Sequence, residues 1–175
     1  MPDDAEARRA LRRLLAPRLA DLGTSFALVV EDVLGEGDGV IDWVAAAPDG
    51  RAWVVLIAAG DADASLLEAG LAQRAWVEDR IPDWRKLAPE LPLRGELTPG
   101  VLLVAHDYAR TTRIAAREAS AGGIALARWS GSLPSGPIEL AAVPTLMRVA
   151  RTTRPTVHRL VSTFRTALRD ADLAN

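Results

Sequence analysis

The amino-acid sequence predicts an α/β domain in which helices flank a central mixed β-sheet. Residues 51–59 and 101–105 are short, almost wholly apolar runs, which are typical of strands covered on both faces. Segments 62–80 and 110–121 follow these runs and have the length and composition of helices. Strands that alternate with helices favour this fold class. The chain has 175 residues, the usual size of one domain, so we interpret residues 1–175 as a single domain.

The composition limits which functions the chain can carry. It is 49% hydrophobic and 25% charged, as in ordinary globular proteins. The absence of cysteine excludes disulfides and thiolate metal sites. The first residues include acids where a secretory signal has bases, and no apolar run is long enough to span a bilayer. We therefore expect a cytoplasmic protein without a membrane partner. Lys86 is the one lysine among 21 basic residues, so a lysine-dependent active site has a single candidate.

Residues 1–25 are expected to form an amphipathic N-terminal helix. Its apolar stripe has helical spacing and consists of Leu11, Leu14, Leu15, Leu19 and Leu22. Pro17 is predicted to kink or shorten the helix. Four basic residues flank the stripe: Arg8, Arg9, Arg12 and Arg13. These side chains are candidates for nucleic-acid binding, together with Arg151, Arg154 and Arg159, although a solvated helix face is the more common explanation of such a charge run.

Residues 26–59 are predicted to form three consecutive strands. A glycine-rich break at 35–39 separates the first two strands, and Pro48-Asp49-Gly50 separates the second from the third. Pro at the second turn position and Gly at the fourth favour a type I turn with a glycine bulge. This turn pairs Ala47 with Arg51 and so sets the register of the two strands.

The same register makes a prediction about side chains farther from the turn. Counting back five residues on each strand places Asp42 opposite Leu56. Because residues two apart on a strand share a face, Asp42, Leu56 and Ala58 are predicted to point the same way. Trp43 and Trp53 are then predicted to lie on the opposite face, as anchors of a hydrophobic core.

The rest of the chain is predicted to alternate between helices and strands. The helix over 62–80 is expected to end before Pro82, and a proline-rich loop follows it. The elements expected after this loop are a strand at 101–105, a helix at 110–121, and strands at 124–129 and 138–143. The C-terminal extension, residues 130–175, is expected to end in an extra helix that starts near Pro155.

Three sequence features between residues 26 and 129 point to a known family. They are Gly39-Val-Ile-Asp42 before the Pro48-Asp49-Gly50 turn, the strand Val54-Val-Leu-Ile-Ala-Ala-Gly60 after it, and Gln73-Arg-Ala-Trp76 on the next helix. The chain resembles the PD-(D/E)xK nuclease-like superfamily, which has the restriction-endonuclease-like fold, and is most similar to its NucS-type endonuclease branch. The family pattern has an Ile-Asp pair, an Asp-Gly turn, a strand that ends in Glu-x-Lys, and a helix with Gln-x-x-x-Tyr.

The resemblance assigns a catalytic position to each of four residues. Asp42 holds the Asp position, Leu56 the Glu position, Ala58 the Lys position, and Gln73 the Gln position. Phosphodiester hydrolysis in this family needs Mg²⁺ held by two carboxylates, with a lysine to activate water or stabilise charge. One carboxylate beside a leucine and an alanine is a poor cage for Mg²⁺. The resemblance therefore implies a catalytically degenerate nuclease-like domain.

Three functional hypotheses follow from this resemblance. The first is a non-enzymatic binding or structural module without a cofactor, for which a second copy of the chain is one open partner. The second is a metal-dependent DNA endonuclease that uses Mg²⁺ or Mn²⁺ and displaced acids around Asp42, such as Asp61, Glu68 or Glu31. The third is nucleic-acid binding without cleavage, through the N-terminal arginines.

Two of the assigned residues have structural explanations as well as functional ones. Asp42 is either a surviving metal ligand or a buried carboxylate paired with an arginine or a backbone amide. The second explanation is favoured, because burying an unpaired carboxylate is costly. Gln73 either faces the former active cleft or lies on the helix surface, and the two interpretations are equally supported.

Other acidic and histidine residues have plain structural explanations. Asp61 and Asp63 suit the N-cap and first turn of the helix that follows them. Glu31 and Asp32 suit a solvated strand end. No motif joins either histidine to a serine or an aspartate, so a hydrolase triad is unsupported.

Overall fold

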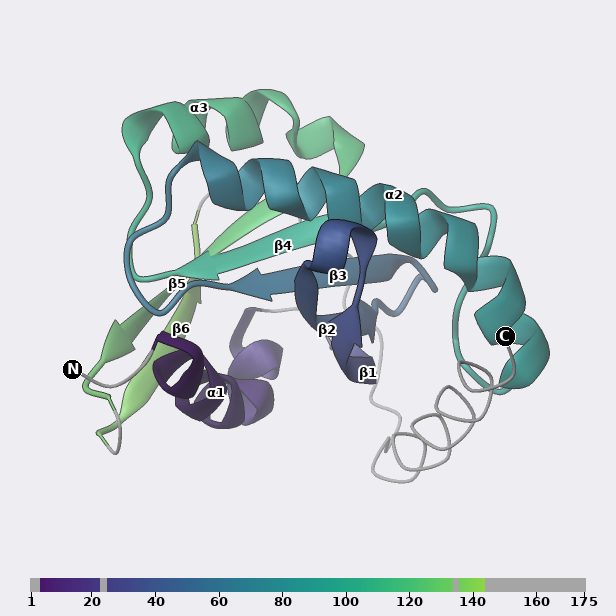
Figure 1. The fold of residues 1–175 in the computed structure, drawn as a ribbon, viewed down its shortest axis with the longest axis horizontal. Coiled ribbons are helices and arrows are strands. Elements are labelled where there is room, and N and C mark those ends of the chain that lie inside the picture. Colours follow the sequence, from purple (N-terminus) through teal and green to yellow (C-terminus); the bar gives the residue numbers. More distant parts are fainter. Residues whose placement is uncertain (1–3, 23–24, 134–135, 144–175) are drawn as a thin grey trace.

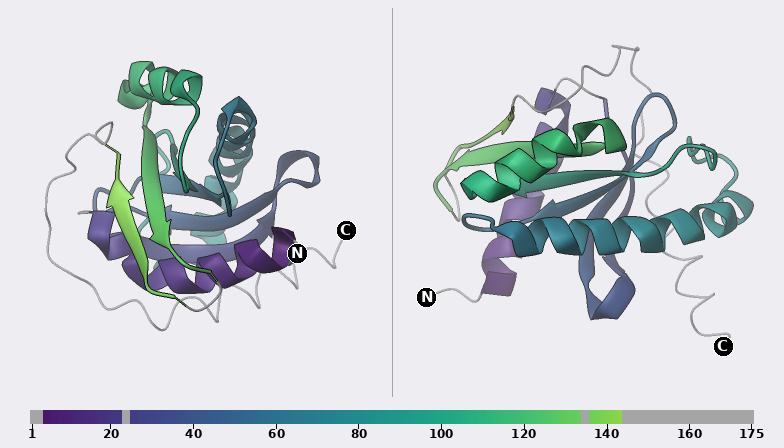
Figure 2. Two further views of the ribbon diagram at one scale, coloured as in Figure 1. Left: turned by 90° about the vertical axis from the view of Figure 1, so that its left-hand side faces the viewer. Right: turned by 90° about the horizontal axis from the view of Figure 1, so that it is seen from above.

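A computed structural model describes residues 4–22, 25–133 and 136–143. Figure 1 shows an α/β arrangement in which one open sheet separates two helical layers. Helix α1 (Asp4–Leu15) and the 3-10 helix η1 (Ala16–Leu22) cover one face. Helices α2 (Ala64–Leu87) and α3 (Arg110–Glu118) cover the other (Figures 1 and 2). The predicted α/β class and central mixed sheet are thus confirmed.

Among the described residues, the sheet has six strands in the spatial order β1-β2-β3-β4-β5-β6. Its strands are β1 (Ala27–Leu34), β2 (Val40–Ala46), β3 (Ala52–Ile57), β4 (Gly100–Ala105), β5 (Ile124–Gly131) and β6 (Ile138–Ala142). The first three strands and the last pair run antiparallel, whereas β3, β4 and β5 run parallel. Parallel neighbours need a crossover connection, which α2 and α3 provide.

The predicted C-terminal helix near Pro155 lies outside the described residues, as do Arg151, Arg154 and Arg159. Within the described part of the chain, no helix is both long enough and apolar enough to cross a membrane.

Strand β3 is apolar throughout because the two faces of the sheet bury separate cores. Val54 and Leu56 pack in the core that α2 and α3 cover. Trp53, Val55 and Ile57 pack in the core that α1 and η1 cover. Since successive side chains of a strand alternate between faces, a strand between two helical layers needs apolar residues at every position.

The β2–β3 hairpin has the register that the turn residues predict. Gly50 N donates to Ala47 O at 2.9 Å, and Ala47 N donates to Arg51 O at 2.9 Å. Gly50 has φ of +85°, the left-handed conformation that the bulge position requires. The ladder then continues to the pair Trp43 and Val55, so the next pair along this register is Asp42 and Leu56.

Prolines affect the two long helices differently. Helix α1 ends at Leu15, and the segment that contains Pro17 continues as a 3-10 helix, as expected. The prediction that the second helix ends before Pro82 is wrong, because α2 continues through this residue to Leu87. Ile81 and Trp84 are each 2% exposed on the inner side of α2. Their burial stabilises the last turns and offsets the hydrogen bond that proline cannot make.

Gly100 provides a test of the packing at the start of β4. A Cβ atom built on Gly100 would lie 2.7 Å from two ring atoms of Trp53, whereas one on Gly60 would meet nothing within 4 Å. We expect Gly100→Ala to lower the free energy of unfolding by about 1–3 kcal/mol, the usual cost of overpacking a core. Gly60→Ala is the matched control and should leave it nearly unchanged. Urea unfolding of the two variants measures the difference, and equal midpoints would contradict the packing described here.

Candidate functional site

Asp42 of β2 lies at the centre of the candidate site and is fully buried. Arg8 of α1 binds its carboxylate with two hydrogen bonds, Nε to Oδ1 at 2.8 Å and Nη2 to Oδ2 at 2.6 Å. The backbone N–H of Ile57 donates to Oδ2 at 2.7 Å. Two-point pairing of this kind is the strongest geometry between a guanidinium and a carboxylate. The prediction of a buried, paired Asp42 is confirmed.

The carboxylate takes the place of a backbone acceptor at the end of the β2–β3 ladder. Ala47 and Arg51 form a hydrogen-bonded pair, and such pairs recur at every second position. A continued ladder would therefore direct the N–H of Ile57 toward the carbonyl of Ile41. It donates to Asp42 instead, so the side chain of Asp42 satisfies the last buried donor of this part of β3.

The alternation of side chains along β2 is interrupted at Asp42. Ile41 and Val44 both pack in the core that α2 covers, although regular alternation would place them on opposite faces. On β1, the pairs on either side place Asp32 across from Asp42, and Asp32 has φ of +55°. This backbone irregularity lets the Asp42 carboxylate reach Arg8 of α1.

The prediction that Asp42, Leu56 and Ala58 share a face is wrong for this reason. Leu56 is 3% exposed in the core that α2 covers, and Ala58 packs against the same core. Asp42 binds α1 on the other side of the sheet, where Trp43 and Trp53 also pack. The hairpin register was predicted correctly, but the register could not reveal the backbone irregularity between Ile41 and Val44.

A second arginine extends the ion pair into a network between α1, β1 and β2. Arg12 pairs with Asp32, and its Nε lies 3.7 Å from Asp42 Oδ1. Burial raises the pKa of Asp42 above its ordinary value, and the hydrogen bonds from Arg8 and Ile57 oppose this shift. Burial also lowers the pKa of Arg12, and the charge of Asp42 opposes this shift. Each charge is therefore kept in the interior by its partners.

The residues around Asp42 do not fit Mg²⁺ or Mn²⁺. Both oxygens of its carboxylate accept hydrogen bonds from protein donors, and a guanidinium already supplies the positive charge. Within the described ranges, no group of three histidine, cysteine, aspartate or glutamate side chains is placed to hold a metal ion. Divalent cations of this kind need several oxygen ligands with free lone pairs.

The candidate displaced acids have other partners or other locations. Asp63 is the N-cap of α2 and accepts from Ser65 N at 2.8 Å, so the helix begins two residues later than predicted and Asp63 caps it in place of Asp61. Asp61 lies 3.1 Å from Nδ1 of His106. Glu68 is exposed on α2, across the sheet from α1.

Glu31 and Asp32 differ from their predicted position. They lie within β1, which runs to Leu34, and not after its end. Asp32 is exposed, as predicted, but it also pairs with Arg12 of α1.

Gln73 has a role that neither sequence interpretation included. It is 4% exposed, and its amide pairs with the backbone of Glu36: Oε1 accepts from Glu36 N and Nε2 donates to Glu36 O, both at 2.9 Å. A Cβ atom on Gly35 would lie 1.8 Å from Oε1, and one on Gly39 would lie 2.4 Å from Nε2. Gln73 therefore anchors the β1–β2 loop to α2, and the flanking glycines were the sequence signal for this contact.

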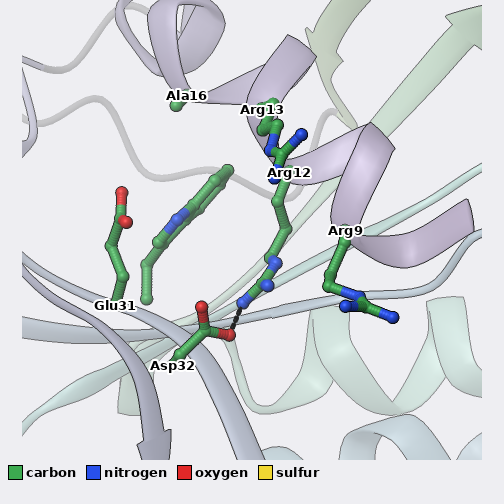
Figure 3. A pocket seen from close by; sticks show the side chains of 7 residues that line it. Arg9, Arg12, Arg13, Ala16, Glu31 and Asp32 are labelled. Atoms are coloured by element: carbon green, nitrogen blue, oxygen red, sulfur yellow. Dashed lines mark hydrogen bonds and ion pairs between the residues drawn. The ribbon is translucent and has the colours of Figure 1, made fainter. Parts of the chain in front are cut away.

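The structure also shows a charged pocket between α1 and β1, which we call the α1–β1 pocket (Figure 3). Its volume is about 320 Å³, and its lining residues are Arg9, Arg12, Arg13, Ala16, Glu31, Asp32 and Trp43. The sequence predicted that the three arginines lie on one helix, but it did not predict that acidic residues lie opposite them.

Trp43 and Trp53 are 2% and 7% exposed, which confirms their predicted role as core anchors.

The four residues to which the resemblance assigns catalytic positions therefore lie in three separate surroundings. Asp42 belongs to an ion-pair network on the α1 side, Leu56 and Ala58 to the opposite core, and Gln73 to a loop anchor.

Comparison of the chain with models of protein families, with curated proteins and with solved structures gives no match.

The Asp42 network can be tested by removing its acceptor. Asp42→Ala should lower the free energy of unfolding by about 2–3 kcal/mol, because the N–H of Ile57 and the guanidinium of Arg8 lose their partner. Asp42→Asn keeps an oxygen for Ile57 and should cost less. Thermal unfolding of both variants measures the two effects. If alanine were tolerated as well as asparagine, the hydrogen bond to Ile57 would contribute nothing.

Introducing the glutamate and lysine that the resemblance expects provides a second test. We expect Leu56→Glu with Ala58→Lys to lower the free energy of unfolding by about 3–5 kcal/mol, because a carboxylate at position 56 would enter an apolar core without a partner. The control is Leu34→Glu on the same sheet, where the leucine is 68% exposed, and this variant should melt near the wild-type temperature. A double variant as stable as the wild type would show that the core at Leu56 admits water.

Proposed function

We propose that this chain is a catalytically degenerate, nuclease-like domain that acts as a non-enzymatic binding or structural module. The observation that carries the proposal is the state of Asp42, whose two carboxylate oxygens are held by Arg8 and by the backbone N–H of Ile57. A metal ligand must offer free lone pairs, and a general base must be able to reach its substrate. The Asp42 carboxylate is fully buried and already accepts three hydrogen bonds, so it is poorly placed for either role.

The surroundings of Leu56 also support this proposal. A Cβ atom on Gly70 of α2 would lie 3.8 Å from Leu56 Cδ1, so the leucine fills the space beneath this helix. The position where the resemblance expects a catalytic glutamate is therefore part of the core. Lys86 is 77% exposed near the end of α2 and pairs with Asp83 at 3.3 Å, which is ordinary for a helix surface.

The arrangement of elements is compatible with the restriction-endonuclease-like core that the resemblance implies. The chain has an N-terminal helix, three antiparallel strands, a helix and a parallel strand in that order. The Asp-Gly turn lies between β2 and β3, and Gln73 lies on the helix that follows β3. We take this agreement as support for a nuclease-like core in residues 26–129 with a lost active site.

A plasmid-nicking assay tests this proposal. Purified protein is incubated with supercoiled plasmid in Mg²⁺, in Mn²⁺ and in EDTA, beside the Asp42→Ala and Asp42→Asn variants. We expect all three proteins to leave the plasmid intact under each condition, because the Asp42 carboxylate is buried and already bound by Arg8 and by the N–H of Ile57.

The proposal of a non-enzymatic module would be contradicted by two patterns of results. Metal-dependent nicking that both Asp42 variants lose, while circular dichroism shows that at least the asparagine variant is folded, would establish the alternative of a metal-dependent DNA endonuclease with displaced acids. Nicking that the variants retain would also contradict a non-enzymatic role, unless it separates from the protein on further purification and so identifies a contaminating nuclease.

A further inference from the structure

We infer that the α1–β1 pocket binds a phosphate group. This inference rests on the proposed binding role of the domain, and it names the chemical class of the ligand. The pocket lies between a helix that contributes three arginines and a strand that contributes two carboxylates (Figure 3). Its volume of about 320 Å³ is sufficient for a phosphate group with part of the molecule that carries it.

The lining of the pocket carries more positive than negative charge. Arg9, Arg12 and Arg13 face Glu31 and Asp32 across it. Asp32 is paired with Arg12, which holds this guanidinium in place on the pocket wall, as Figure 3 shows. The Nε of Arg12 is buried and lies 3.7 Å from Asp42 Oδ1, so this edge of the guanidinium faces the interior. A planar guanidinium held in a fixed orientation suits the geometry of phosphate oxygens.

The spacing of the arginines along α1 creates two pairs of like charge. Residues four apart on a helix are neighbours, and like charges at this spacing destabilise the helix. The Arg8 and Arg12 pair is compensated within the protein by Asp42 and Asp32. The Arg9 and Arg13 pair is exposed and lines the pocket together with Glu31. A dianionic or monoanionic phosphate bound beside these two side chains would reduce their mutual repulsion.

The apolar part of the pocket indicates how the ligand is recognised. Trp43 contributes to the lining, but it is only 2% exposed and is packed in the core that α1 covers. It therefore offers too little ring surface for a nucleobase to stack on. Guanidinium groups that contact only the phosphate carry no information on base identity, so binding of a nucleic acid through such contacts would be independent of sequence.

Binding is measured in EDTA and at low salt, so that cleavage cannot contribute. The probes are inorganic phosphate, adenosine monophosphate and a fluorescent single-stranded oligonucleotide. The site variant is Arg9→Gln with Arg13→Gln, which removes two exposed guanidiniums. The matched control is Arg110→Gln with Arg117→Gln, which removes two exposed arginines from α3 on the other side of the sheet.

We expect the wild type and the control to bind with similar affinity and the site variant to bind about tenfold or more weakly, with a shallower dependence on salt. Tight binding of the oligonucleotide would identify the backbone of a nucleic acid as the source of the phosphate. Tight binding of adenosine monophosphate or inorganic phosphate without the oligonucleotide would identify a small phosphate ester or the free ion. Either result supports the site.

The inference is overturned by any of three results: the wild type binds none of the probes, the site variant binds as well as the wild type, or the control loses as much affinity as the site variant. Circular dichroism of each variant shows that the comparison is made between folded proteins. Because no metal is present, this result is separate from the nicking assay. Metal-dependent cleavage would contradict the proposed function and leave the phosphate measurement valid.

Discussion

The pairing of the buried Asp42 carboxylate with Arg8 is the interaction on which the α1 side of the structure depends. A fully buried charge is tolerated only with partners that replace water. Arg8 and the N–H of Ile57 provide three hydrogen bonds between 2.6 and 2.8 Å. These contacts attach α1 to the sheet and satisfy the donor at the end of the β2–β3 ladder. The same carboxylate thus determines where the hairpin ends and where the helix packs.

The two faces of the sheet have different chemistry as a result. The α2 side is held by apolar packing, to which Leu56 contributes, and by the amide of Gln73, which fixes the β1–β2 loop. The α1 side combines an apolar core with a network of arginines and acids at its edge. A charged residue at position 56 would disrupt the apolar packing on the α2 side. On the α1 side, ion pairs and hydrogen bonds already stabilise a buried charge.

This asymmetry connects the proposed loss of nuclease chemistry with the proposed binding role. A guanidinium at Asp42 supplies the positive charge that a metal would bring to a nuclease site, but it cannot polarise water or exchange its ligands. The neighbouring arginines of α1 extend from this ion pair to the surface and line the α1–β1 pocket. The helix that neutralises the acid of the sheet therefore also presents cationic groups to solvent, where phosphate is the chemically matched ligand.

The sequence by itself determined the fold class, the order of the elements described here and the register of the β2–β3 hairpin. These follow from local rules: apolar periodicity, and the backbone conformation that Pro48 and Gly50 allow at the turn. Only the tertiary structure decided which way Asp42 points, that α2 continues past Pro82, and that Gln73 binds the backbone of Glu36. Each of these depends on contacts between residues far apart in the chain, which can override local preferences because burial and hydrogen bonding outweigh propensity.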